Sequence, residues 1–179
     1  MPNPRYFSVA IFSLVCCALF LASCNSGGQD DREDTSPVHY SFSDLANWDA
    51  FDPGEGGLGT DLKGYVGSVF DGRYMYMVPA YNSTVGSFGK VARYDTQAPF
   101  PDVSSWEAFD PGEAGLAAGL RGYNGGTFDG RHVYFVPNMV NGEMHGKVMR
   151  YDTNLPFADV GSWEAYDLET SAALGSVHS

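Results

Sequence analysis

The chain has 179 residues, of which 44% are hydrophobic and 15% aromatic, so it is long enough and apolar enough to form a folded core. It carries 10 Lys and Arg against 22 Asp and Glu. This acidic balance argues against a nucleic-acid partner and against electrostatic docking on anionic lipid, because both need clustered basic side chains.

Residues 1–23 have the three parts of a secretory signal sequence. Arg5 charges the start, an apolar run too short to span a bilayer follows, and small residues end it. The stretch Leu-Ala-Ser-Cys at residues 21–24 resembles the lipobox of bacterial lipoproteins. The resemblance implies that the signal is removed before Cys24, and that this cysteine receives fatty acyl groups such as palmitate, which insert into membrane lipid. An ordinary secretory signal that contains a cysteine by chance is the alternative.

Cysteine usage fits the lipoprotein interpretation. Cys16 and Cys17 lie inside the apolar run and leave with the signal, so Cys24 becomes the only cysteine of the mature chain and no intramolecular disulfide can form. After the lipidated cysteine, residues 24–37 form a polar, acidic stretch that cannot bury enough surface to fold, and we expect a flexible tether. The predicted location is therefore extracytoplasmic and lipid-anchored, on the cell membrane or the outer membrane.

The rest of the chain is organised by an internal repeat. We expect a repeat β domain at residues 38–168 and a C-terminal tail at residues 169–179. Within the domain, two copies of one pattern run over residues 64–110 and 122–167. A regular repeat of about 58 residues indicates a modular architecture in which neighbouring units share a core.

Each copy begins with a predicted β-hairpin. Phe-Asp-Gly-Arg occurs at residues 70–73 and again at 128–131, and Asp-Gly is a strong turn signal because both positions tolerate positive φ. The second strand of each hairpin stops at a proline, Pro79 or Pro137, which cannot donate to the strand ladder. The predicted strands cover residues 64–70, 73–78 and 90–95 in the first copy, and 122–128, 131–136 and 147–152 in the second.

A tryptophan motif closes each copy and also occurs once before the first. It reads Phe-x-Asp, three residues, then Trp-(Asp/Glu)-Ala-(Phe/Tyr)-Asp, at residues 42–52, 100–110 and 157–167. The second and third occurrences supply the fourth strand of each copy. The first, from Trp48 to Asp52, predicts an extra N-terminal strand whose sheet partners are missing.

These patterns predict an all-β fold. In the strand at residues 73–78, Tyr and Val point to one face and Met to the other, so both faces are apolar and we expect each sheet to lie between two other layers. The prediction is two four-stranded antiparallel propeller-type blades plus the extra N-terminal strand. This forms an incomplete β-propeller, either open or completed by an oligomer. A β-sandwich shares the strand content.

The second copy carries the residues of a further resemblance. Gly125-Gly126, Tyr134, Tyr151-Asp152 and Trp163 follow one another in the order of a kelch-type propeller repeat. The chain therefore resembles kelch-like β-propeller proteins between Trp48 and Asp167. The resemblance implies propeller blades and says little about function.

Polar residues that recur in both copies are interpreted as structural. Asp71 and Asp129 are expected to form turns at the hairpin tips. The acidic pair Asp110 and Glu113 could bind calcium, but turn formation is preferred because no run of alternating acids follows. His132 is interpreted as a packing residue because its counterpart is a tyrosine. No metal, cofactor or catalytic residue is predicted, and a non-enzymatic role is favoured.

The loops after the two prolines differ most between the copies, and variable loops on a repeated frame are where recognition usually occurs. The candidate ligand-binding residues there are Tyr81, Asn82, Asn138 and Asn141, for a glycan or a protein. The predicted function is that of a membrane-anchored, extracytoplasmic lipoprotein whose kelch-like repeats act as a binding or interaction module. The alternatives are a fragment or relic of a cell-envelope propeller enzyme such as a glycosidase, and a structural role in a homo-oligomer.

Overall fold

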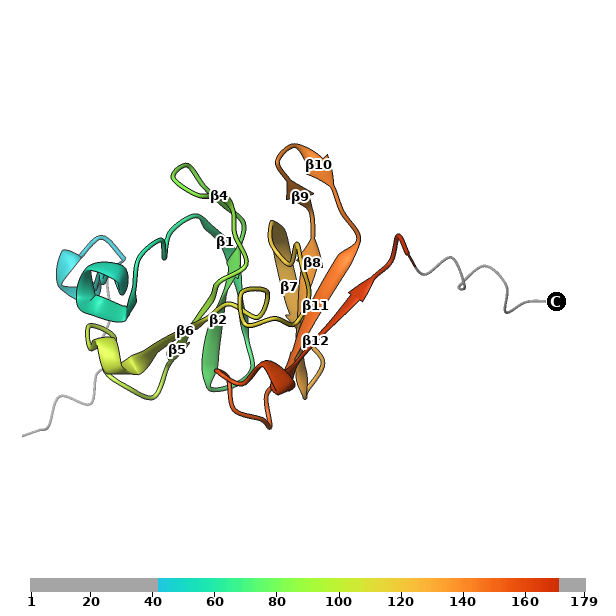
Figure 1. Cartoon of the computed structure of the whole chain (residues 1–179). Coiled ribbons are helices and arrows are strands. Elements are labelled where there is room, and N and C mark those ends of the chain that lie inside the picture. Colours follow the sequence, from blue (N-terminus) through green and yellow to red (C-terminus); the bar gives the residue numbers. More distant parts are fainter. Residues whose placement is uncertain (1–41, 171–179) are drawn as a thin grey trace, which may run out of the picture. The chain divides into compact units, whose positions relative to one another are not determined.

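The two repeats fold into two four-stranded antiparallel sheets that lie next to each other (Figure 1). The computed structural model describes residues 42–170. The predicted signal sequence at residues 1–23, the lipidation site Cys24, the tether up to residue 37 and the tail from residue 171 onward lie outside the described residues.

The strand order is the same in both sheets and confirms the all-β prediction. The first sheet has the order β1-β2-β5-β6, and the second has the equivalent order β7-β8-β11-β12. The strands of the first sheet are β1 (Tyr65–Phe70), β2 (Tyr74–Pro79), β5 (Val91–Asp95) and β6 (Trp106–Phe109). Those of the second are β7 (Tyr123–Phe128), β8 (His132–Pro137), β11 (Lys147–Asp152) and β12 (Trp163–Asp167).

Each sheet has one irregularity at the same place. The pairing of β1 with β2 shifts between Tyr65 and Ser68, and the pairing of β7 with β8 shifts between Tyr123 and Gly126. Gly67 lies within the first shift, and its φ of 74° needs a residue without a Cβ. The two sheets are therefore the same unit built twice.

Two further sheets of two strands each were not predicted, because the segments after the prolines were interpreted as loops. They are hairpins formed by very short strands: β3 (Tyr81–Asn82) with β4 (Gly86–Ser87), and β9 (Met139–Val140) with β10 (Glu143–Met144).

The tryptophan motif folds into the same local turn in all three places. Each turn contains one short 3-10 helix, η1 (Leu45–Asn47), η3 (Val103–Ser105) or η4 (Val160–Ser162). The preceding aspartate, Asp44, Asp102 or Asp159, caps it by accepting a hydrogen bond from a backbone N–H two residues later.

The extra N-terminal strand predicted from Trp48 to Asp52 is not formed. Trp48 is extended, with φ −121° and ψ 131°, but no strand pairs with this segment among the described residues. An extended segment becomes a β-strand only when a neighbour satisfies its backbone hydrogen bonds. The chain instead continues into a short helical turn, η2 (Gly54–Leu58).

The main core of the described region lies between the two sheets. Its fully or almost fully buried members include Tyr76 and Val78 from the first sheet, and Tyr123, Phe135, Tyr151 and Trp163 from the second. The outer faces are less covered, with Met75 and Met77 half-buried and Val136 exposed. On the outer side of the first sheet, Trp106 and Ala92 are nonetheless buried, and Phe51 contacts Trp106. The expectation that each sheet lies between two layers is therefore met in part by the first sheet, whereas no second layer covers the second sheet among the described residues.

Candidate functional site

The two short hairpins touch at one edge of the sheets. Both extend beyond the four-stranded sheets at the same end (Figure 1). The hydroxyl of Ser87 in β4 donates a hydrogen bond to the carbonyl oxygen of Met139 in β9 at 3.1 Å. A Cβ added at Gly86 would lie 3.8 Å from Oδ1 of Asn141. The fold thus joins residues 80–88 and 138–145, the segments that differ most between repeats, into one surface that we call the hairpin rim.

The four residues predicted to bind a ligand all belong to the hairpin rim, but their environments differ. Tyr81 is 63% exposed, and Asn141 is exposed with a φ of 53°. Asn138 is half-buried. Asn82 is only 2% exposed, and its Oδ1 accepts a hydrogen bond from the backbone N–H of Thr84 at 2.8 Å. Asn82 therefore holds the hairpin in shape, and Tyr81 and Asn141 are the two most accessible to a ligand.

A pocket of about 360 Å³ opens beside the hairpin rim. Side chains of both charges line it together with apolar groups, which suits a polar ligand that has hydrogen-bond donors and acceptors. Its lining includes Val85, Ser87, Phe88, Lys90, Asp110 and Arg121. No local sequence pattern points to this pocket, because its walls come from separate segments and Asp110 has the spacing of an ordinary turn residue.

Asp110 is an acid of this pocket whose pKa is raised. Its Oδ1 accepts hydrogen bonds from the backbone N–H groups of Gly112 at 3.0 Å and Glu113 at 3.1 Å, which confirms the predicted turn. Burial nevertheless raises the pKa of Asp110, and the charge of Glu113 adds to this effect. The pocket therefore holds a carboxylate that is incompletely solvated.

Two tyrosines with buried hydroxyls lie within electrostatic reach of Asp110. The hydroxyls of Tyr65 and Tyr123 are buried and have no hydrogen-bond partner among residues 42–170. Burial, followed by the charge of Asp110, raises the pKa of both phenols. Both hydroxyls therefore remain protonated at neutral pH.

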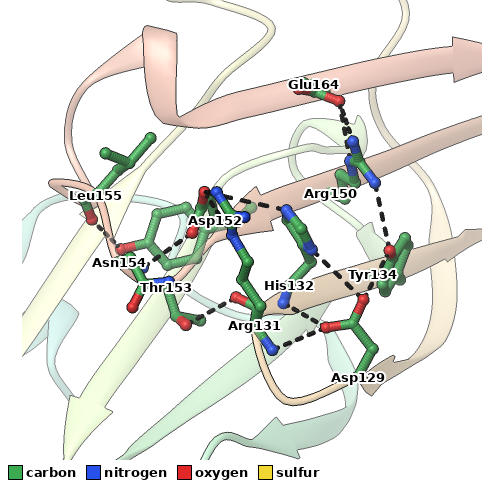
Figure 2. Close-up of polar contacts among 11 residues, drawn as sticks. Asp129, Arg131, His132, Tyr134, Arg150, Asp152, Thr153, Asn154, Leu155 and Glu164 are labelled. Carbon is green, nitrogen blue, oxygen red and sulfur yellow. Dashed lines mark hydrogen bonds and ion pairs between the residues drawn. The ribbon is translucent and has the colours of Figure 1, made fainter.

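A separate polar network surrounds the Asp-Gly turn of the second repeat (Figure 2). Asp129 Oδ1 accepts hydrogen bonds from the backbone N–H groups of His132 at 2.6 Å and Arg131 at 2.8 Å. The hydroxyl of Tyr134 donates to Asp129 Oδ2 at 2.9 Å. These bonds, first of all that from His132, hold the pKa of Asp129 well below its usual range. Asp129 is therefore a turn-forming carboxylate, as predicted.

Two ion pairs extend the network across the second sheet (Figure 2). Arg131 pairs with Asp152 at 2.7 Å, and Arg150 pairs with Glu164 at 2.6 Å. The hydrogen bond from Arg131 is the main reason that the pKa of Asp152 is lowered. His132 lies between the two aspartates, with Nδ1 3.4 Å from Asp129 Oδ2 and Nε2 4.0 Å from Asp152 Oδ2.

The first repeat contains the same network, which identifies it as part of the scaffold. Asp71 Oδ1 accepts from the backbone N–H of Arg73 at 2.8 Å. Arg73 pairs with Asp95 at 2.7 Å, and Arg93 pairs with Glu107 at 3.1 Å. Because the turn bonds and the two arginine–carboxylate pairs recur one repeat earlier, they hold the repeated fold together, whereas the His132 contacts are specific to the second repeat, where the first has Tyr74.

A smaller pocket of about 210 Å³ adjoins the network of the second repeat, with Asp152 and Glu164 in its lining. Glycoside hydrolysis by two carboxyl groups needs a general acid whose pKa is raised. Both carboxylates here are paired with arginine, and the pKa of Asp152 is lowered instead. This pocket therefore lacks the acid that such chemistry requires.

Two observations bear on metals and membranes. In residues 42–170, no three His, Cys, Asp or Glu side chains are grouped so that they could hold a metal ion. The helices of this same region are all too short to cross a bilayer.

The chain was also compared with known proteins. No protein family, no curated protein and no solved structure matches it.

Proposed function

We propose that this chain is a lipid-anchored extracytoplasmic lipoprotein whose two sheets are kelch-like propeller blades, and that it acts as a binding module through the hairpin rim. The anchor is Cys24, and the acidic tether up to residue 37 holds the blades away from the membrane surface. The ligand is a glycan or a protein segment outside the cytoplasm.

The observation that carries the proposal is that residues common to both repeats and residues that differ between them lie in different parts of the fold. The polar contacts that the two repeats share, the Asp-Gly turns and the arginine–carboxylate pairs, hold the sheets together. The segments that differ most are brought together by the bond between Ser87 and Met139 and lie beside the pocket that contains Asp110. Variable loops gathered on one edge of a repeated frame are the usual arrangement of a recognition surface.

The chemistry of the hairpin rim supports a polar ligand. The ring of Tyr81 is exposed and can stack on the apolar face of a sugar or on a peptide side chain. The amide of Asn141 is exposed and offers both a donor and an acceptor. The pocket adds Lys90, Asp110 and Arg121, which could bind charged or hydroxyl groups.

The propeller-blade part of the proposal has its own support. Four-stranded antiparallel sheets follow each other along the chain and bury their faces against each other, as blades do. Close contact between neighbouring sheets is made possible at Gly126, where an added Cβ would lie 2.8 Å from Cγ2 of Val69.

Ligand binding is tested with the full chain in a mild detergent against arrays of cell-envelope glycans and of extracytoplasmic peptides. Tyr81→Ala should weaken binding of the best ligand by about tenfold, which corresponds to about 1.4 kcal/mol. Tyr166→Ala is the matched control, because Tyr166 is also exposed, at 52%, but lies on β12 outside the hairpin rim. Equal loss in both variants, or binding unaffected by Tyr81→Ala, would contradict the proposal.

A hydrolytic enzyme is the second candidate, and one observation favours it. Asp110 lies in a pocket and has a raised pKa, as a general acid needs. Hydrolysis of an envelope polysaccharide that is abolished in Asp110→Asn would establish this candidate in place of the first.

A further inference from the structure

The contact between the two sheets defines a pair of complementary surfaces. On the first sheet, the buried face presents Tyr76, Val78 and the guanidinium of Arg93. Tyr151 and Phe157 of the second repeat contact these side chains. The ring of Tyr76 lies 5.8 Å from that of Tyr151 and 6.2 Å from that of Phe157, and the guanidinium of Arg93 lies 4.4 Å above the ring of Phe157. We call these two surfaces the arginine face and the tryptophan face, since Trp163 completes the second.

The second sheet presents another arginine face on its outer side. Tyr134, Val136 and Arg150 stand at the positions that Tyr76, Val78 and Arg93 occupy one repeat earlier. Val78 is fully buried, whereas Val136 is 48% exposed. The side chain of Arg93 is 12% exposed and that of Arg150 is 37% exposed. This arginine face therefore has the chemistry of an interface but no covering sheet among the described residues.

The first sheet presents another tryptophan face on its own outer side. Tyr94 stacks on Trp106 at 4.8 Å, the distance that separates Tyr151 from Trp163. Phe51 covers the outer part of this face by contacting Trp106, but Phe70 on the inner strand β1 is 53% exposed. The equivalent residue of the second sheet, Phe128, packs against the core between the sheets.

We propose that two copies of this chain associate head to tail, with the outer tryptophan face of one copy covering the outer arginine face of the other. The partner is a second copy, because each chain has both a free arginine face and a free tryptophan face. These two kinds of face already pack against each other between the two sheets of one chain. Such a contact is heterologous, so it leaves one free face at each end and continues until it closes a ring or forms a filament. Anchoring to a membrane would raise the local concentration of copies.

The intramolecular contact predicts which residues meet between copies. Val69 approaches Gly126 inside the chain, with Cγ2 2.8 Å from an added Cβ. The equivalent pair between copies is Thr127 of one and Ser68 of the other, and both are exposed. Within one chain these two residues lie on opposite outer faces, so they cannot be joined without a second copy.

Cross-linking tests this geometry in the full chain, purified in mild detergent with Cys16, Cys17 and Cys24 replaced by serine. Ser68→Cys mixed with Thr127→Cys should give a disulfide-linked dimer on mild oxidation. Neither variant oxidised alone should give more than a few per cent of dimer. Ser83→Cys mixed with Thr127→Cys is the control, because Ser83 is an exposed serine at a hairpin tip. No dimer from the first mixture, or equal yields with the control, overturns the proposal.

Sedimentation of the same full chain gives a measurement that does not rely on a disulfide. The unsubstituted chain should sediment as a multimer, and Val136→Lys should weaken association by at least tenfold. Ser83→Lys adds the same charge at an exposed position, in the turn between β3 and β4 rather than on a face of either four-stranded sheet, and it should leave association unchanged. A monomer at high concentration, or an equal effect of both substitutions, refutes head-to-tail association.

Discussion

The indole nitrogen of Trp163 donates a hydrogen bond of 2.9 Å to the carbonyl oxygen of Phe157. The same bond joins Trp106 to Phe100 at 3.0 Å, and Trp48 to the carbonyl oxygen of Phe42 at 2.9 Å. The motif at Trp48 forms this bond although no strand follows it, so the turn is determined by local residues. What the sheets add is burial: Trp48 is 53% exposed, whereas Trp163 is 2% exposed.

This difference predicts unequal effects of removing the indole. Trp163→Ala should lower the free energy of unfolding by about 3–5 kcal/mol, because it empties a closely packed site between the sheets. Trp48→Ala should cost less than about 1 kcal/mol, because its ring is mostly in water. Urea denaturation of both variants checks the prediction, and similar losses would show that the local turn rather than the core carries the stability.

Substitution of Gly126 by any residue with a Cβ is expected to destabilise the fold. An added Cβ would meet both the carbonyl oxygen of Tyr134 and, at 2.8 Å, Cγ2 of Val69. Gly126→Ala should therefore destabilise the fold by about 1–3 kcal/mol through overpacking. Gly161→Ala is the control, since the nearest atom to its Cβ would be 3.4 Å away, and it should change stability by less than about 0.5 kcal/mol. Thermal unfolding of the two variants separates these outcomes.

The pair of Arg131 and Asp152 predicts a pH dependence. Because the folded pKa of Asp152 is lowered, the stabilisation is present above the unfolded pKa, about 3.9, and is lost as the pH falls through the folded value. Asp152→Asn should therefore be less stable than the native chain at pH 7, and the gap should narrow below about pH 4. Denaturation midpoints measured between neutral and acid pH test this, and a gap that widens on acidification would contradict it.

Cys24 is predicted to hold the protein on the membrane. Cys24→Ser should move the protein from the membrane fraction to the soluble extracytoplasmic fraction, because a single site carries all the acyl chains. Cys16→Ser, inside the signal, should leave the distribution unchanged. Fractionation and labelling with a fatty-acid analogue report both effects, and a Cys24→Ser protein that stays bound would refute the lipid anchor.

The repeat allowed much of the fold to be predicted. The Asp-Gly turns, the stops at Pro79 and Pro137, and the strand starting at Trp163 were all visible as local chemistry, and they appear where expected. These features are decided by neighbouring residues, so a pattern in one copy, checked against the other, was enough.

What was missed depends on contacts between distant residues. The strand expected at Trp48 has no partner to pair with among the described residues, although its residues match those of β6 and β12. The sequence predicts loops at the hairpin rim, because strands of two residues are too short to show an alternating pattern. Asn82 was predicted to be accessible to a ligand, but it is buried and its Oδ1 accepts a hydrogen bond from the backbone N–H of Thr84. The pocket that contains Asp110 is lined by segments that lie far apart in the sequence, so no local pattern predicts it.

The repeated turn has an optical consequence. Three tryptophans occupy the same local geometry in successive motifs, but their surroundings grade from mostly water at Trp48 to a buried aromatic cluster at Trp163. Their fluorescence should therefore differ in emission wavelength and in accessibility to a quencher such as acrylamide. Retaining one tryptophan at a time would give three single-site reporters of the chain, each following the solvent exposure of one motif as the protein unfolds or associates.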